Sequence, residues 1–117
     1  MIHHVQLCMP RAQEAAARGF YAGVLGLAEV PKPPALARRG GAWFRGAGIE
    51  LHLGVDDDFR PAGKAHPGLL VDDLDDRAAR IVGAGGPVTW DDGFPGMRRF
   101  YTADPFGNRL EFLQPAT

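Results

Sequence analysis

The sequence contains little of what marks secreted, membrane-bound or nucleic-acid-binding proteins. Its one cysteine, Cys8, cannot form a disulfide within the chain. The 13 Lys and Arg nearly balance the 14 Asp and Glu, which excludes a strong general attraction to nucleic acid or to anionic membranes. Apolar runs stay far below the roughly 20 residues of a membrane span, and residues 1–10 lack the basic and apolar segments of a secretion signal. We therefore expect a cytoplasmic protein that binds neither membrane nor nucleic acid.

The sequence has enough hydrophobic residues, however, to form one compact domain. It has 117 residues, of which 45% are hydrophobic, so a core of ordinary size can form. The 16 glycines and 10 prolines predict a chain with many turns, which is typical of proteins with many short strands. We expect a single domain over residues 1–117.

The hydrophobic pattern predicts the same element order, a strand, a helix and three strands, in each half of the chain. In the first half, alternation or helical spacing of apolar residues indicates a strand at 2–10, a helix at 13–27, an edge strand at 29–34, and strands at 42–45 and 48–55. In the second half it indicates a strand at 65–71, a helix at 74–84, and strands at 88–90, 97–102 and 109–114. The prediction is an α+β fold of two βαβββ modules, with module one at 1–60 and module two at 61–117.

A histidine and a glutamate recur at similar spacing in the two modules. Glu50 follows His4 by 46 residues, and Glu111 follows His66 by 45. An internal repeat of this kind changes the prediction of the whole fold, because both copies are expected to place the pair at equivalent positions. The sequence therefore predicts that the modules carry the same acid and base in register.

Alternation along the strands predicts which side chains share the face opposite the buried one. On that face we expect a polar set consisting of His4, Gln6, Cys8, Glu50, His52, His66 and Glu111. Two imidazoles and two carboxylates that converge make a divalent metal site with room for water, and such ligands suit Zn, Ni, Co, Mn or Fe without selecting among them. The predicted ligands are His4, Glu50, His66 and Glu111.

Other polar residues are candidates for the surroundings of such a site. Gln6 and Cys8 share the predicted polar face, with Gln6 the better hydrogen-bond donor to a ligand. Arg98 and Arg99 alternate along one strand, so one of them faces the cavity, where a guanidinium can bind a carboxylate or phosphate. The alternative for Cys8 is a small buried hydrophobic residue, and that for the arginines is a solvent-exposed side chain at the edge.

Three motifs resemble the vicinal oxygen chelate superfamily, and the resemblance covers essentially the whole chain. They are F-Y-x-x-V-L-G-L at 20–27, H-x-G-L-x-V at 66–71 and D-P-F-G-N-R-L-E-F at 104–112, the last being the most specific. This superfamily includes glyoxalase I, fosfomycin-resistance proteins, extradiol dioxygenases, methylmalonyl-CoA epimerase and bleomycin-resistance proteins. The resemblance implies that the curved sheets of two modules form a cleft with the helices outside.

The resemblance also implies a ligand set and a reaction. In metal-binding members the ligands lie on the first and last strand of each module, which implies His4, Glu50, His66 and Glu111 here, with His52 an alternative to Glu50. The closest pattern is that of glyoxalase I, which implies a metal-dependent lyase or isomerase. Such an enzyme acts on a small substrate with vicinal oxygens through an enediolate, and Glu50 or Glu111 moves the proton.

Two other functions follow from the same resemblance. A metal-free protein resembling the bleomycin-resistance group would bind a small drug-like molecule, whereas a metal-dependent dioxygenase would need iron or manganese. The superfamily also implies a homodimer in which the modules of two chains pair, the alternative being that both modules close within one chain. Substrate and metal identity are left open by the sequence.

Overall fold

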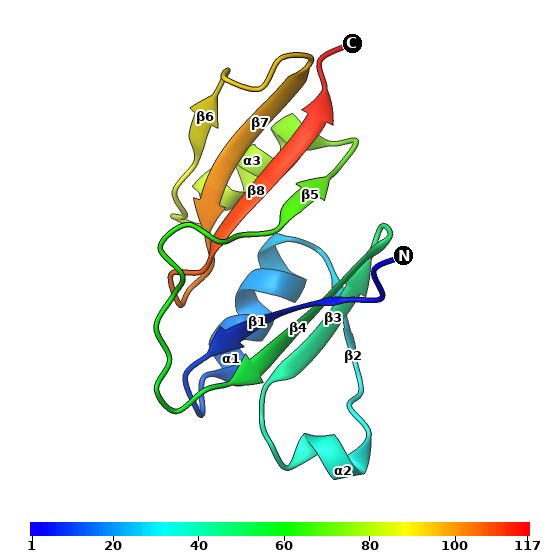
Figure 1. The fold of residues 1–117 in the computed structure, drawn as a ribbon, viewed down its shortest axis with the longest axis vertical. Helices are drawn as coiled ribbons and strands as arrows, with labels where there is room; N and C mark the ends of the chain where they lie inside the picture. The colour runs from blue at the N-terminus through cyan, green and yellow to red at the C-terminus, as the bar shows by residue number, and fades with distance from the viewer. The chain divides into compact units, whose positions relative to one another are not determined.

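The computed structural model describes all residues from Met1 to Thr117. The chain forms two compact units, residues 1–61 and 62–117, and each contains one four-stranded sheet (Figure 1). The mixed α+β fold and the repeated strand, helix and three strands are confirmed.

The first unit is a sheet with the strand order β1-β4-β3-β2. Its elements are β1 (Val5–Met9), α1 (Glu14–Arg18), the π-helix η1 (Gly19–Val24), β2 (Ala28–Val30), α2 (Pro34–Ala37), β3 (Ala42–Gly46) and β4 (Ile49–Val55). The pair β1 and β4 is parallel, whereas β4, β3 and β2 are joined by antiparallel pairing. The first and last strands of the unit therefore lie side by side.

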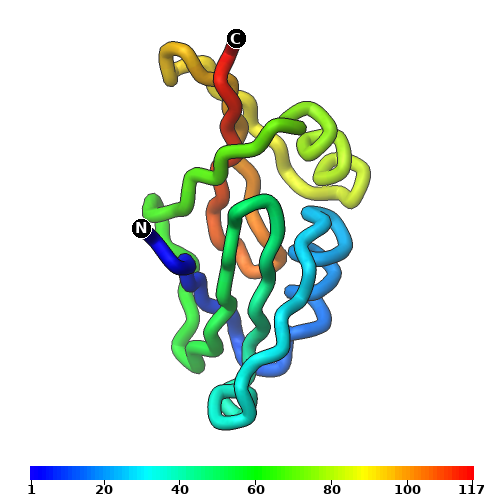
Figure 2. Tube along the Cα trace, turned by 90° about the vertical axis from the view of Figure 1, so that its right-hand side faces the viewer, coloured from blue at the N-terminus to red at the C-terminus, as the bar shows by residue number.

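The helical segment of this unit covers one face of its sheet (Figures 1 and 2). Met9, Tyr21, Phe44 and Leu53 are fully buried in that core. The predicted single helix is an α-helix continued by a π-helix, whose wider hydrogen bonds include Leu25 N–H to the carbonyl of Phe20 at 2.9 Å. The segment ends at a glycine in the left-handed region, Gly26, with a φ of 76°.

The strand predicted at 29–34 is shorter than expected. β2 lies at the edge of the sheet as predicted but ends at Val30, and a one-turn helix, α2, begins at Pro34. Proline suits the first turn of a helix because its missing N–H has no helical partner there. The three prolines of this segment therefore end the strand and begin a helix.

The second unit repeats this arrangement with the strand order β5-β8-β7-β6. Its elements are β5 (Gly68–Leu70), α3 (Leu74–Gly83), β6 (Thr89–Asp91), β7 (Met97–Ala103) and β8 (Arg109–Pro115). The pair β5 and β8 is parallel, and β8, β7 and β6 pair antiparallel. The buried side chains of Phe100, Leu110 and Phe112 and of Leu74 and Ile81 on α3 form the core of this unit.

Polar side chains contribute to both the start and the buried face of α3. Asp73 precedes the helix, but its carboxylate binds Arg77 and Arg80, and the side chain of Gln114 accepts the Leu74 N–H at 3.1 Å instead. Val82 on this helix is exposed. The buried Arg77 takes part in the buried face instead, with its guanidinium 5.6 Å from the ring of Phe112.

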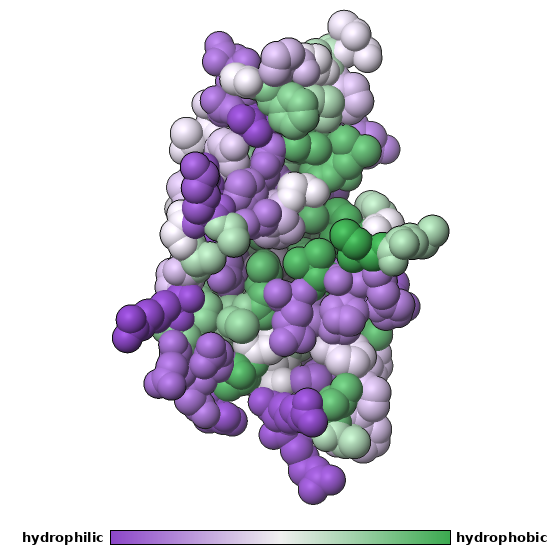
Figure 3. All heavy atoms as spheres, viewed as in Figure 1, coloured by the Kyte–Doolittle hydropathy of each residue, from purple (hydrophilic) through white to green (hydrophobic).

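Some large hydrophobic side chains remain at the surface. Leu70, Val82, Trp90 and Phe94 are exposed, and Figure 3 shows hydrophobic residues among hydrophilic ones on the face that it draws. No helix combines the length and the apolar character needed to cross a membrane.

Candidate functional site

In the second unit, the two predicted site residues His66 and Glu111 are in direct contact. Glu111 on β8 pairs with Gly68 on β5, and His66 lies two residues before Gly68. The Nε2 atom of His66 is 2.9 Å from Oε1 of Glu111, and the two side chains are 21% and 8% exposed. The first and last strands of the unit thus bring the predicted imidazole and carboxylate together.

The other ring nitrogen of His66 fixes the tautomer of the imidazole. Nδ1 lies 2.8 Å from the backbone carbonyl of Lys64, and a carbonyl oxygen only accepts hydrogen bonds, so Nδ1 carries a proton. In a neutral ring, Nε2 then presents a lone pair to a carboxylate oxygen. The lone pair and the negatively charged oxygen repel each other, and a cation bound by both groups relieves this repulsion. A backbone-anchored Nδ1–H is also typical of metal-binding histidines.

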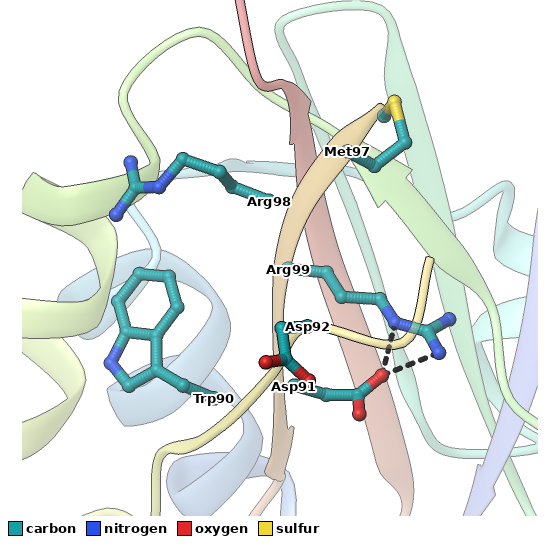
Figure 4. Close-up of a pocket in the computed structure, with 6 residues that line it drawn as sticks. All are labelled: Trp90, Asp91, Asp92, Met97, Arg98 and Arg99. Carbon is teal, nitrogen blue, oxygen red and sulfur yellow. Dashed lines mark hydrogen bonds and ion pairs between the residues drawn. The ribbon is translucent and has the colours of Figure 1, made fainter. Parts of the chain in front are cut away.

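The second oxygen of Glu111 is held by Arg99. Nη1 of Arg99 is 3.1 Å from Oε2 of Glu111, and its Nε lies 2.7 Å from Oδ2 of Asp91. Figure 4 shows Arg99 joined to a single oxygen of Asp91. The guanidinium also lies 5.3 Å from the ring of Phe94 and 5.2 Å from that of Tyr101. Both oxygens of Glu111 therefore have a fixed partner.

In the first unit, His4 and His52 form an aromatic stack with Trp43. The rings of His4 and His52 are 3.9 Å apart at 15°, and those of His52 and Trp43 are 4.1 Å apart at 7°. His52 is only 5% exposed, and its Nε2 has no hydrogen-bond partner. Burial, followed by the neighbouring His4, lowers the pKa of His52, so the ring at the centre of the stack is held neutral.

This stack bears on the choice between Glu50 and His52 as a metal ligand. An imidazole binds a metal through a nitrogen lone pair that lies in the plane of the ring. The nearly parallel planes of His4 and His52 do not meet at a common point near the rings. In this arrangement the two histidines cannot bind one ion together.

Glu50 is held at one oxygen and nearly free at the other. Its Oε1 accepts hydrogen bonds from Arg45, with Nη2 at 2.7 Å and Nε at 2.9 Å, whereas Oε2 has only His3 nearby, at 3.8 Å. The hydrogen bond from Arg45 lowers the pKa of Glu50, so this carboxylate is ionised at neutral pH.

The strand pairing places the repeated residues in a register that differs from the predicted one. Gln6 pairs with His52 and Gly68 pairs with Glu111, and His4 and His66 each precede the first member of these pairs by two residues. By register, the counterpart of Glu111 is therefore His52 rather than Glu50. Equal spacing along the chain did not reveal this, because the loops between the strands differ in length.

The remaining candidates occupy separate places. The side chain of Gln6 lies over Gly54, where an added Cβ would be 2.6 Å from its Nε2, and Cys8 is half-buried. Arg98 turns to α3, where both its Nη atoms are 2.9 Å from the carboxylate of Asp75. Of the two arginines, only Arg99 contacts Glu111. Sequence reasoning did not include Asp91, the ion-pair partner of Arg99.

The structure brings together two possible metal ligands, but not a complete set of ligands for a metal ion. Nowhere in residues 1–117 do three His, Cys, Asp or Glu side chains form a group able to hold a metal ion. Within the second unit, His66 and Glu111 are chemically suitable as one nitrogen and one oxygen ligand.

Comparison with known proteins places the chain in a family. Residues 6–113 match the model of the glyoxalase-like domain family. A glyoxalase family protein from Bacillus anthracis is 42% identical, with a TM-score of 0.94 over 98% of this chain and 94% of that one. No curated protein sequence matches the chain.

Two more distant structures have the same fold. An antibiotic-binding protein from Streptomyces is 25% identical, with a TM-score of 0.72 over 99% of this chain and 97% of that one. Lactoylglutathione lyase from Agrobacterium tumefaciens is 24% identical, with a TM-score of 0.68 over 94% of this chain and 91% of that one. The chain belongs to the glyoxalase-like domain family, which confirms the resemblance to the vicinal oxygen chelate superfamily.

The buried ring of His52 leads to a prediction about acid stability. Because its pKa is lowered in the folded protein, the unfolded state takes up a proton more readily. Its contribution to stability is therefore complete above the ordinary imidazole pKa, and it is lost as the pH falls below that value. The substitution His52→Phe keeps a flat ring and removes this proton uptake. The fall in Tm between about pH 7.5 and about pH 5.5 should become smaller.

A matched control uses a histidine outside the stack. His3 is largely exposed and reaches the stack only through the ring of His4, 5.2 Å away, so His3→Gln should change the pH dependence of Tm much less than His52→Phe does. Thermal unfolding followed by circular dichroism checks both variants. An unchanged slope in His52→Phe would contradict the prediction.

Proposed function

We propose that the protein is a metal-dependent lyase or isomerase that acts on a small molecule with vicinal oxygens. The observation that carries the proposal is the partly buried contact between His66 and Glu111, with Nδ1 of His66 anchored to a backbone carbonyl. This arrangement supports metal binding because it presents an imidazole lone pair and a carboxylate oxygen to the same place.

We assign the ligands as the sequence predicts them. His66 and Glu111 supply one nitrogen and one oxygen, and His4 and Glu50 are the proposed remaining ligands. His52 is less suitable because its ring is stacked between Trp43 and His4. When bound, a divalent metal polarises the substrate oxygens and makes the adjacent C–H more acidic.

The two glutamates differ in their suitability for proton transfer. Both oxygens of Glu111 are engaged, by His66 and by Arg99, which suits a fixed ligand. Glu50 has one oxygen held by Arg45 and one without a close partner, and it is ionised. We therefore assign Glu50 as the base that removes the proton next to the substrate carbonyl, forming the enediolate, and that returns a proton in the product.

Elemental analysis of the purified full-length chain tests the proposal most directly. We expect about one divalent metal ion for each set of proposed ligands, and a Tm that falls when a chelator removes the ion, because a bound ligand stabilises the folded state. The metal-loaded protein should also introduce deuterium from heavy water next to the carbonyl of small α-hydroxy ketones or 2-hydroxy acids. A chelator should stop this exchange. If adding the chelator changes neither the Tm nor the exchange, the proposal is refuted.

Metal-free binding of a small molecule is the second candidate function. It is supported by the similarity to the antibiotic-binding protein from Streptomyces and by the contact between His66 and Glu111, because a doubly protonated His66 would donate its Nε2–H to Glu111 with no metal between them. This candidate predicts no bound metal and the same Tm with and without chelator, so the same experiment separates the two functions.

A further inference from the structure

A cavity lies at the β6 edge of the second sheet, next to the contact between Arg99 and Glu111. Its volume is about 370 Å³, and it is lined by Trp90, Asp91, Asp92, Met97, Arg98 and Arg99 (Figure 4). Sites for small organic molecules begin at about 300 Å³, so the cavity is large enough for a small ligand. All of its lining residues belong to one unit.

Arg99 has hydrogen-bonding capacity that its protein partners do not use. A guanidinium carries five N–H donors. In Arg99, Nε and Nη2 each direct one to Asp91, and Nη1 directs one to Glu111. Two donors are left, and the flanking rings of Phe94 and Tyr101 hold the guanidinium in place. Such a fixed arginine is suited to binding a carboxylate.

The two partners of Arg99 differ in how easily a ligand could replace them. The side chain of Glu111 is 8% exposed, whereas that of Asp91 is 35% exposed. Moving Asp91 into water costs little, because solvent can replace the lost ion pair. An incoming carboxylate can therefore take the place of Asp91 on Arg99 while Glu111 keeps its own contact.

The cavity also offers hydrophobic surface beside this cation. Met97 lies on the same face of β7 as Arg99, and the ring of Phe94, which is 44% exposed, lies 5.3 Å from the guanidinium. Trp90 and Arg98 line the other side of this edge, where the guanidinium of Arg98 lies 5.1 Å from the ring of Trp90 (Figure 4). An aromatic or aliphatic group next to the carboxylate would thus find apolar contacts.

We infer that this cavity binds a small organic acid, with the carboxylate on Arg99 and the hydrophobic part against Met97 and Phe94. The inference rests on the proposed function in one respect, since it makes the substrate of the proposed enzyme a small acid. Carboxylate binding itself requires only Arg99 and the cavity. Glu111 links the cavity to the proposed metal site, because it contacts both Arg99 and His66.

Binding to the metal-free full-length chain tests the inference. The probes are mandelate and benzoate, with mandelamide and benzamide as uncharged controls of nearly the same shape, followed by calorimetry. We expect the acids to bind about tenfold more tightly than the amides, since a hydrogen-bonded charge contributes more than a neutral group. Binding of neither acid at about 10 mM, or equal binding of acid and amide, would overturn the inference.

Three substitutions separate a binding role of Arg99 from a structural one. Arg99→Gln should weaken binding of the acids about tenfold, and Asp91→Asn should strengthen it by releasing Arg99 and removing a negative charge. Arg109→Gln is the matched control, because Arg109 also packs on Tyr101 but lies outside the cavity, and its affinity should equal that of the wild type. Weaker binding in Asp91→Asn would overturn the inference.

The outcome also distinguishes this inference from the proposed function. Glu111→Gln should lose metal but still bind mandelate, because Arg99 remains in place. Metal retention without binding of either acid would overturn only the inference. Acid binding in a protein that never holds metal would leave the inference standing and refute the proposed enzyme.

Discussion

Replacing Glu111 with alanine is expected to abolish metal retention and to lower turnover at least about a hundredfold. Changes to residues that merely support a metal ligand cost about 10- to 100-fold in affinity or activity, so loss of a ligand should cost no less. Glu111 is buried between His66 and Arg99. Its removal takes away the oxygen ligand and leaves the positive charge of Arg99 with only Asp91 as a partner.

Three further variants define what this result means. His66→Ala should lose metal to the same extent as Glu111→Ala. Arg109→Gln, which changes a residue on the same strand as Glu111, should retain the metal. Glu111→Gln keeps the size of the side chain and an oxygen for Arg99, so it separates loss of a ligand from loss of packing. Metal content by elemental analysis and the initial rate of solvent exchange are the measurements. Wild-type metal content and exchange in folded Glu111→Ala would contradict the assignment of Glu111.

The contact between His66 and Glu111 could be predicted because it depends only on alternation and strand order. Alternation places both residues on the polar face of their strands, and the repeat makes the first and last strands of each module equivalent. Parallel pairing of β5 with β8 then brings the two side chains to 2.9 Å. The element order and the shared polar face thus follow from periodicity, whereas the parallel pairing that joins the two residues is given by the structure.

The corresponding contact in the first unit could not be predicted in the same way. Counting residues from His4 to Glu50 includes the loops, and the segment with β2 and α2 has a length of its own. Only the pairing of Gln6 with His52 reveals that His52 takes the place of Glu111. The stack of His52 between Trp43 and His4 depends in addition on side-chain rotation, which alternation does not determine.

The ion pairs of Arg99 lie beyond sequence reasoning for a related reason. Alternation indicates that one of Arg98 and Arg99 faces the polar side, and the structure assigns this place to Arg99. The partner Asp91, however, belongs to β6, and its pairing with Arg99 on β7 depends on the length of the intervening turn. Register set by a turn is a property of local backbone geometry that a hydrophobic pattern does not contain.

The turn between β7 and β8 contains a buried hydrogen-bonded carboxylate, Asp104. Its Oδ1 accepts the backbone N–H of Phe106 at 2.9 Å and that of Asn108 at 2.8 Å, and its Oδ2 accepts the side-chain amide of Asn108 at 2.8 Å. Asp104 and Asn108 are both buried. This turn sets the register in which Tyr101 pairs with Glu111.

Asp104→Ala is therefore expected to lower the free energy of unfolding by about 3 kcal/mol or more, because it leaves buried donors without an acceptor. That is a large part of the roughly 5–15 kcal/mol by which such domains are stable. Urea denaturation measures the loss, and metal content measured well below the melting temperature reports whether Glu111 keeps its place.

The donor and acceptor pattern of this turn allows a sharper test. Asp104→Asn keeps an oxygen for the two backbone N–H groups but sets an amide NH₂ against that of Asn108, so its loss should be intermediate. The double variant Asp104→Asn/Asn108→Asp exchanges donor and acceptor and should recover part of the stability, since each buried polar group again has a partner. If the stability losses of the single variants Asp104→Asn and Asn108→Asp simply added in the double variant, the side-chain hydrogen bond would not be the source of the stability. If the double variant recovers stability and metal together, then the turn supports the candidate site through the register of β7 and β8.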